Sequence, residues 1–349
     1  MGHSVTRIET ISNGLVDERR VGYTSDLLDD RDPNWLVPGE LLFSHINSPE
    51  RVGHVALYEG HPQKLFHGIN LLRLRPAESL LDPHFALHLL RSEVFRSKLR
   101  PFVNQAVNQA SVSATNLKSI AVPLPPLEEQ RRIASILDAA DALRTKRRQA
   151  LAKLDTLAQA IFIDMFGDPL HLSRGGSEPT SESKLGELAR VRTGKLDANA
   201  SSEDGIYPFF TCASEPLRID VSAFECNAIL VAGNGDLNVK YFEGKFNAYQ
   251  RTYVIDSLDE SRAHPRFLHG FLDIYVGRLR EQAIGGVIRY IKLGMLTEAV
   301  VQLPSQHAQS VYVRTIEAVD AARSLAEHSE KQADALFTAL QYRAFRGEL

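Results

Sequence analysis

The chain has 349 residues, a length that suits two or three domains better than one. Hydrophobic residues make up 44% of it and charged residues 24%, which is the composition of a globular protein and not of a disordered chain. The formal net charge of -3 gives no overall attraction to a polyanion, which counts against a protein that simply coats nucleic acid. Any contact with DNA must therefore use local basic patches.

The first segment, residues 1–123, predicts strands and one short helix. A turn and an apolar strand lie at Leu36–Leu42, a β-rich run follows at Leu71–Leu74, and a short helix is predicted around Phe85–Leu90. Strands and a helix within one stretch of this length indicate a mixed α/β domain.

A long helix is predicted over residues 124–168. From Leu127 to Phe166 the chain contains neither glycine nor proline, and Gly167 follows directly. Apolar residues recur at helical spacing at Ile133, Leu137, Ala140, Leu151, Leu154, Ala158, Ile161 and Met165. At 1.5 Å per residue such a helix is ~60 Å long, too long to bury its apolar stripe within one small domain. It therefore needs a partner helix of similar length.

The second half repeats this order. Residues 169–303 predict another mixed α/β domain, with a strand at Cys226–Val231 and a helix around Phe267–Leu272. Residues 304–349 supply the partner helix, because neither glycine nor proline occurs from Gln306 to Arg346. We predict an α+β fold in which two similar mixed α/β domains are separated by an antiparallel pair of long coiled-coil helices.

The two helices and their lead-in segments are copies of one another. A shift of 179 positions places Leu117 on Leu296 and Gln130 on Gln309, and it gives 13 identities over 52 positions without a gap. Self-similarity at a fixed spacing indicates an internal duplication. The second half also has a lead-in at Leu185–Gly194 with no counterpart before Val5, so the first domain is expected to be shortened at its N-terminal side.

The sequence resembles the specificity (S) subunits of type I restriction–modification systems. The most specific stretch is Leu124–Ala134, which reads LPPLEEQRRIA and leads into the first long helix, and the duplication and the Phe-Gly stop at the end of that helix agree with it. In the second copy the corresponding stretch, Leu303–Gln309, is a degraded form of the first. The resemblance covers nearly the whole chain.

This resemblance implies a non-catalytic subunit that reads a bipartite site on double-stranded DNA. In the family each variable domain recognises half of the target, the paired helices space the two domains, and methyltransferase (M) and restriction (R) subunits assemble with them. The resemblance thus implies membership of a site-specific deoxyribonuclease and adenine methyltransferase complex. We assign to partner binding the helix residues Leu137, Leu151, Leu154, Ile316, Leu336 and Leu340.

Polar loops are the candidates for contact with DNA, because Asn, Gln and Arg are the natural partners of base edges in the major groove. Taken singly, each residue is better explained by a solvated turn or cap, by roughly two to one, but as loops taken together they favour DNA contact. The candidates are Ser44, Asn47, Arg51, Asn108, Gln109, Ser113, Asn234, Asn238, Lys240, Gln250, Arg251, Arg289 and Lys292. The basic run Arg144–Arg148 is instead expected to be solvated or to pair with acidic residues of the second helix, namely Glu317, Asp320, Glu327 and Glu330.

No catalytic or cofactor motif accompanies these loops. Arg192–Lys195 lacks the rest of a phosphate-binding loop, and no Asn/Asp-Pro-Pro-aromatic tetrapeptide of an amino-methyltransferase occurs. His84 and His88 are expected on a helix surface and not at a metal, and we expect no cofactor. The alternative functions are a coiled-coil scaffold whose globular domains bind proteins and, less favoured, a hydrolase without a recognised motif.

The cysteine content and hydropathy indicate the cellular compartment. Cys212 and Cys226 are too few for a disulfide framework, which fits a reducing environment, and we interpret both as small apolar core residues. No apolar run approaches the ~20 residues of a membrane span. We therefore expect a cytoplasmic protein without a membrane partner.

Overall fold

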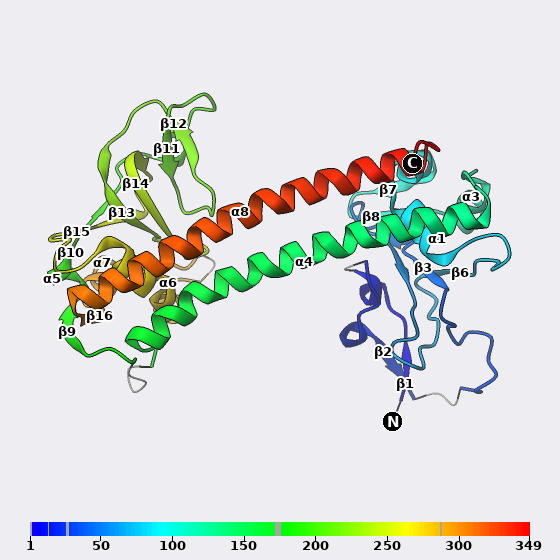
Figure 1. Cartoon of the computed structure of the whole chain (residues 1–349), viewed down its shortest axis with the longest axis horizontal. Helices are drawn as coiled ribbons and strands as arrows, with labels where there is room; N and C mark the ends of the chain where they lie inside the picture. The colour runs from blue at the N-terminus through cyan, green and yellow to red at the C-terminus, as the bar shows by residue number, and fades with distance from the viewer. Residues whose placement is uncertain (1, 13, 26–27, 172–175, 287) are drawn as a thin grey trace. The chain divides into compact units, whose positions relative to one another are not determined.

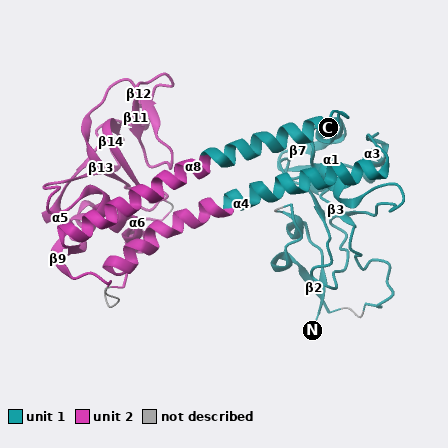
Figure 2. Ribbon diagram, viewed as in Figure 1, with its two compact units in different colours: residues 1–148, 328–349 teal, residues 149–327 magenta. Residues whose placement is uncertain are grey.

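The protein is described from a computed structural model that places residues 2–12, 14–25, 28–171, 176–286 and 288–349. The chain forms two compact units (Figure 2). The first unit holds Met1–Arg148 and His328–Leu349, and the second unit holds Gln149–Glu327. Each unit therefore contains part of both long helices.

The long helices α4 (Leu127–Phe166) and α8 (Gln306–Ala344) pack antiparallel (Figure 1). Helix α4 spans the predicted residues and ends where Gly167 takes a positive φ of 87°, a backbone conformation that suits glycine at a helix end. Helix α8 begins as predicted, where the Ser305 hydroxyl accepts a hydrogen bond from the Ala308 amide, and ends two residues earlier than expected. The predicted α+β class with two mixed domains and antiparallel long helices is confirmed.

The first unit is built around a three-stranded antiparallel sheet of order β5-β3-β6. Its strands are β1 (His3–Val5), β2 (Gly22–Thr24), β3 (Leu41–Phe43), β4 (Ile46–Asn47), β5 (Val55–Leu57), β6 (Leu72–Leu74), β7 (Asn104–Ala106) and β8 (Gln109–Ser111). Its helices, besides its parts of α4 and α8, are α1 (Pro83–Arg91), α2 (Glu93–Leu99) and α3 (Ala114–Ser119), with 3-10 turns at Ile8–Ile11, Glu18–Arg20 and Arg100–Phe102. Apolar side chains of β3 and β5 pack against α1 and α2 to form its main core.

The second unit has a larger sheet of order β10-β15-β13-β14-β11-β12, in which only the β11–β14 pair is parallel. Its strands are β9 (Thr180–Lys184), β10 (Ala189–Thr193), β11 (Tyr207–Phe210), β12 (Leu217–Ile219), β13 (Phe224–Ala232), β14 (Val239–Ala248), β15 (Thr252–Ser257) and β16 (Val300–Pro304). Its helices, besides its parts of α4 and α8, are α5 (Leu185–Leu188), α6 (Pro265–Gln282) and α7 (Leu293–Thr297), with a 3-10 turn at Ala198–Ala200. Strands β9 and β16 pair separately.

The central strands of the two units are equivalent. In the first unit β3 lies between β5 and β6, and in the second β13 lies between β14 and β15, with antiparallel pairing in both. In each unit a helix follows the sheet, α1 or α6, and packs against the start of one long helix and the end of the other. The expected lead-in is present in the second unit as α5 and β10, where β10 extends the sheet beside β15.

A buried glutamine joins each long helix to its unit. Gln130 is fully buried and its amide makes three hydrogen bonds, to Leu80 O at 2.9 Å, to Pro125 O at 2.8 Å and from the Asp82 amide at 2.9 Å. Asp82 is the N-cap of α1, so this side chain ties the first turn of α4 to the start of α1.

Gln309 makes the same three kinds of bond in the second unit. Its amide donates to Arg262 O at 2.9 Å and to Pro304 O at 3.1 Å, and accepts from the amide of His264 at 2.8 Å. His264 is the N-cap of α6. The two glutamines coincide in the repeat, so the duplication preserves this junction.

Matching ion pairs join α4 and α8 within each unit. Arg144 Nε lies 2.7 Å from Asp334 Oδ1 in the first unit, and Arg323 lies 3.2 Å from Asp155 in the second. In the repeat Arg144 corresponds to Arg323, and Asp155 to Asp334. The basic run therefore pairs with α8 as expected, because Arg148 lies 3.1 Å from Glu330. It also pairs with Asp334, which was not among the predicted partners.

His88 corrects one expectation. It was placed on the surface of its helix, but its side chain is only 2% exposed and its Nε2 lies 2.7 Å from Asp138 Oδ1 of α4. The helix stripe that carries Phe85 and Leu89 turns this residue towards α4 as well. His84 shares the same aspartate at 3.1 Å. In the part of the chain that the structure describes, no three His, Cys, Asp or Glu side chains are grouped to hold a metal ion.

Candidate nucleic-acid interface

In the first unit, a polar hairpin packs beside the turn that follows the central strand. Strands β7 and β8 form the hairpin, and β4 pairs with β8 so that Ile46 faces Ser111 and Asn47 faces Ala110. Asn108 and Gln109 are exposed on this hairpin, and their side chains have no hydrogen-bond partner among the described residues. Both amides are therefore available to an external group.

Other predicted residues of the first unit are partly or wholly engaged within the chain. Asn47 donates to Ser44 Oγ at 3.1 Å and accepts from the Ser48 amide at 2.8 Å, and Ser44 is only 1% exposed. Ser113 caps α3 by accepting a hydrogen bond from the Asn116 amide at 3.0 Å. These three side chains shape the loop more than they offer free polar groups.

The loop next to this hairpin carries an exposed arginine. Arg51 is exposed, and its side chain makes no ion pair with a described residue. Burial lowers the pKa of His54, and the positive charges of Arg96 and Arg51 lower it further. An exposed guanidinium group without an ion-pair partner suits an approaching phosphate.

The second unit has the same arrangement at equivalent positions. Asn234 forms a bridge with Tyr290, as Ile46 does with Ser111, and the Ile291 amide donates to Gly233 O at 3.0 Å, as the Val112 amide does to His45 O at 2.8 Å. In the repeat Ser111 corresponds to Tyr290. The turn after the central strand and the following hairpin thus meet in the same register in both units.

Three loops of the second unit surround a pocket of about 150 Å³. The pocket is lined by Thr193, Gly233, Gln250, Arg251, Tyr253, Tyr290 and Ile291. The Gly233 amide donates to Arg251 O at 2.8 Å, and this bond joins the loop at Gly233 to the loop at Gln250 and Arg251. The structure therefore brings together Asn234, the neighbouring residues Gln250 and Arg251, and Arg289, which come from three separate segments of the sequence.

Four predicted residues of the second unit are exposed around this pocket. Arg251 and Lys292 are exposed, and their side chains have no described hydrogen-bond or ion-pair partner. Gln250 donates to Asp197 Oδ2 at 3.2 Å, which leaves its amide oxygen free, and Arg289 makes one long bond of 3.4 Å to Arg280 O. Exposed cations beside amide groups suit contacts to phosphates and base edges.

Asn238 and Lys240, which the sequence predicted to contact DNA, make hydrogen bonds within their own turn. The Asn238 amide donates to Cys212 O at 2.8 Å and to Asp236 O at 2.9 Å, and its oxygen accepts a hydrogen bond from Lys240. Burial lowers the pKa of the Lys240 amine. Both side chains are directed into the turn, so they stabilise its conformation.

The residues assigned to partner binding divide into buried and accessible side chains. Leu137 is fully buried against α1 and the end of α8, and Ile316 is buried in the core of the second unit. Leu340 packs at the edge of the same cluster as Leu137. Leu151 and Leu154 are partly exposed, and Leu336 is 49% exposed. Leu151, Leu154 and Leu336 therefore retain apolar surface that a second protein could cover, and Leu340 is also only partly buried.

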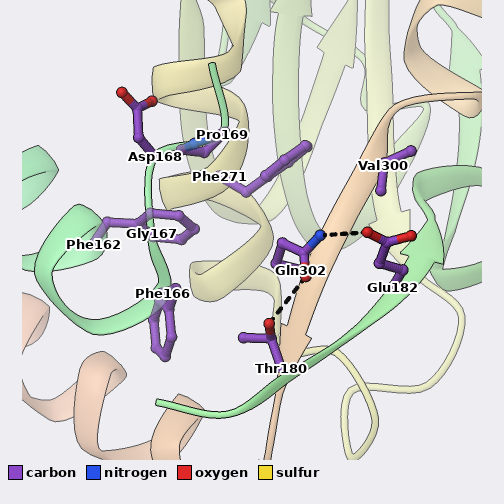
Figure 3. Close-up of a pocket in the computed structure, with 10 residues that line it drawn as sticks. All are labelled: Phe162, Phe166, Gly167, Asp168, Pro169, Thr180, Glu182, Phe271, Val300 and Gln302. Carbon is purple, nitrogen blue, oxygen red and sulfur yellow. Dashed lines mark hydrogen bonds between the residues drawn. The ribbon is translucent and has the colours of Figure 1, made fainter. Parts of the chain in front are cut away.

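A further pocket of about 200 Å³ lies at the end of α4 in the second unit (Figure 3). Phe162, Phe166 and Phe271 form its apolar wall. Its polar side chains bond to each other, because Thr180 donates to Gln302 Oε1 at 3.0 Å and Gln302 donates to Glu182 Oε1 at 3.1 Å. Polar groups that are already paired offer little to a ligand, so this pocket is a junction between α4 and the β9–β16 pair.

Two participating residues were missed from the sequence. Cys212, interpreted as an apolar core residue, is only half-buried, and its thiol lies 2.8 Å from Asn234 Oδ1. Tyr290, which lines the pocket, sits next to the predicted Arg289, and its match with Ser111 in the repeat was the available signal. No sequence pattern joins Cys212 to Asn234, since their contact depends on how β11 lies in the sheet.

Comparisons with known proteins agree with the duplicated structure. The sequence matches the family described as the type I restriction modification DNA specificity domain over residues 4–154 and 178–334. A relative from Methanocaldococcus jannaschii, named as the MjaX type I restriction enzyme specificity subunit, is 45% identical over 144 residues, which cover 41% of this chain and 34% of the relative. The EcoDI type I restriction enzyme specificity subunit of Escherichia coli is 43% identical over 134 residues, covering 38% and 30%. The chain thus spans about a third of the length of these curated relatives.

Solved structures share the fold at low sequence identity. A chain from a type I R-M system, whose study concerns complex assembly and conformational transition, has a TM-score of 0.61 at 16% identity and covers 100% of this chain and 92% of its own length. The S subunit of a type I restriction–modification system from M. genitalium has a TM-score of 0.59 at 17% identity, covering 93% and 85%. Among the helices that the structure describes, none combines the length and the hydropathy required to span a bilayer.

Proposed function

Because the chain belongs to the type I restriction modification DNA specificity domain family, we propose that it is a non-catalytic subunit that reads a two-part target on double-stranded DNA. It directs methyltransferase and restriction subunits to that target. The chemistry resides in those partners, and this chain supplies sequence recognition.

The observation that carries this proposal is the matching register of the two polar surfaces. Ile46 and Ser111 in one unit occupy the positions of Asn234 and Tyr290 in the other, and exposed amides or cations flank both pairs. The two surfaces share a backbone arrangement but carry different side chains, which suits two DNA half-sites of different sequence. Cations such as Arg51 and Arg251 would contact phosphates, and amides such as Gln109 would contact base edges.

In this proposal the chain divides by role. Residues 1–123 and 169–303 are the two recognition domains, and residues 124–168 and 304–349 are helices that space them. The buried glutamine junctions and the Arg–Asp pairs support a rigid attachment of helix to domain within each unit. Leu151, Leu154 and Leu336 are the apolar side chains that a methyltransferase subunit could cover.

The test is to express the chain with its methyltransferase and restriction subunits and to map methylated adenines across a genome. We expect a motif of two short half-sites separated by an unread gap. Asn108→Ala with Gln109→Ala should relax one half-site, and Arg289→Ala should weaken recognition of the other. Arg147→Ala is the matched control, because Arg147 is exposed on α4 and belongs to neither hairpin. Loss of both half-sites in either variant, or no defined motif in the wild type, would contradict the proposal.

A further inference from the structure

The thiol of Cys212 contacts the side chain of Asn234. Cys212 follows strand β11, and its Sγ lies 2.8 Å from Asn234 Oδ1 and 3.6 Å from Arg251 O. A thiol carries one hydrogen, and the nearer acceptor is the amide oxygen of Asn234. The hydrogen bond therefore turns that oxygen inwards.

The backbone around Asn234 is held from both sides. The Ile291 amide donates to Gly233 O at 3.0 Å, and the Gly235 amide donates to Arg289 O at 3.0 Å. Asn234 is thus fixed between two hydrogen bonds to the hairpin, with its oxygen held by Cys212. A residue whose backbone and side-chain oxygen are both held is pre-organised for recognition.

The amide nitrogen of Asn234 is left facing solvent. Its Nδ2 has no hydrogen-bond partner among the described residues. Nδ2 is not one of the buried polar atoms without a partner, so it remains accessible to solvent. Asn234 consequently presents a donor and no acceptor. Asn238, by contrast, has its oxygen and its nitrogen engaged within the turn, and its bond to Cys212 O fixes the loop that carries the thiol.

We propose that Cys212 is a positioning residue and that it makes Asn234 a reader of keto groups on base edges. This inference rests on the proposed function and deepens it. A free asparagine can turn to donate and accept together, and so it suits adenine. An asparagine restricted to donation can bond to guanine O6 or thymine O4 in the major groove, whereas adenine and cytosine carry an amino group at the equivalent place and adenine can accept only at N7.

The first unit lacks this device. Ile46 occupies the position of Asn234 and offers no polar group to a base. The keto preference is therefore confined to one position of the half-site that the second unit reads. Base choice at the corresponding position of the first half-site must come from other side chains, such as Asn108 and Gln109.

The test is selection of bound sequences by the full chain from a library of randomised DNA duplexes. The wild type should favour guanine or thymine at one position of one half-site by roughly tenfold, the usual scale for a single base contact. Asn234→Asp keeps the shape and the thiol bond but replaces the outward donor with an acceptor. It should invert the preference towards adenine or cytosine at that position alone.

Cysteine variants test the positioning role separately. Cys212→Ser retains a donor and should keep the wild-type preference, whereas Cys212→Ala releases the amide and should reduce the preference to less than about twofold. Cys226→Ala is the matched control, since Cys226 packs against the apolar cluster around Phe210 and Phe246. Thermal melts identify any variant that fails to fold, and Asn234→Asp is then decisive.

The outcomes separate the two claims. A wild-type motif that Asn234→Asp leaves unchanged, or a Cys212→Ala preference equal to that of the wild type, would overturn the keto-reading inference and leave the proposed function intact. Selection of no motif by the wild-type chain would overturn both.

Discussion

The buried amide of Gln130 should contribute strongly to the stability of the first unit. Its three hydrogen bonds tie the first turn of α4 to the N-cap of α1, and the side chain is fully buried. Gln130→Ala removes all three and leaves one amide and two carbonyl groups without their partner. A hydrogen bond contributes about 1 kcal/mol net, and a buried group left unpaired costs more, so the loss should be about 3 kcal/mol.

The loss should be visible as a lower melting temperature. For a unit of this size, each kcal/mol lowers the midpoint by about 2–4 °C, so Gln130→Ala should melt roughly 6–12 °C below the wild type. Circular dichroism at 222 nm or scanning calorimetry measures the shift. Gln309→Ala in the second unit should have a similar effect, because its amide makes the same three kinds of bond.

Gln149→Ala is the matched control. Gln149 lies on α4 but is exposed, so this substitution makes the same change in helix propensity without breaking a buried bond. If Gln130→Ala lowered the midpoint no more than Gln149→Ala, the glutamine junction would carry no stability, and the rigid attachment of helix to domain would need another source.

Three further outcomes are expected. Arg144→Ala should lower the free energy of unfolding in urea by about 1–2 kcal/mol, because Arg144 is 20% exposed and stacks 4.3 Å from the centre of the Phe337 ring. Arg323→Ala should lower it by less than about 0.5 kcal/mol, because Arg323 and its aspartate partner are half-exposed. Equal losses would refute this ranking. Burial lowers the pKa of His88, so the unfolded chain binds a proton at this residue more readily than the folded chain does. The free energy of unfolding should therefore fall as the pH drops below 6.5. If a His88→Gln variant lost stability just as steeply with falling pH, His88 would not be the cause. Inserting one heptad into the middle of both α4 and α8 should lengthen the unread gap in the methylation motif without altering either half-site, and an unchanged gap would rule out a spacer role.

The helical part of the fold could be predicted from the sequence because its signals are local. Absence of glycine and proline, together with apolar spacing, fixed α4 at Leu127–Phe166, and the repeat placed Gln130 on Gln309 before any hydrogen bond was visible. Helix periodicity depends on residues three and four positions apart, so it can be recognised from the sequence alone. The end of α8 was predicted two residues too late because no glycine lies nearer than Gly347.

The candidate site was less predictable because it depends on partners distant in the sequence. Asn234 and Asn238 look alike in the sequence, yet one presents a free donor and the other is fully engaged by its own turn. Cys212 lies 22 residues before Asn234 and meets it only because β11 pairs with β14. Residue type can suggest which side chains are able to read a base, but the hydrogen bonds that leave a donor free are set by tertiary contacts.

Differences in length between the two halves lie before the long helices and not within them. Ile46 and Ser111 are 65 positions apart in the first unit, whereas Asn234 and Tyr290 are 56 apart in the second, although both pairs form the same bridge. From Leu117 onwards the repeat continues for 52 positions without a gap. Insertions in surface loops cost little free energy, but a single insertion in a helix rotates every later side chain by about 100° and would separate Gln309 or Asp334 from its partners. The packing of the helices therefore fixes the frame of the repeat, whereas the segments between β4 and β8, and between Asn234 and Tyr290 in the second unit, can differ in length.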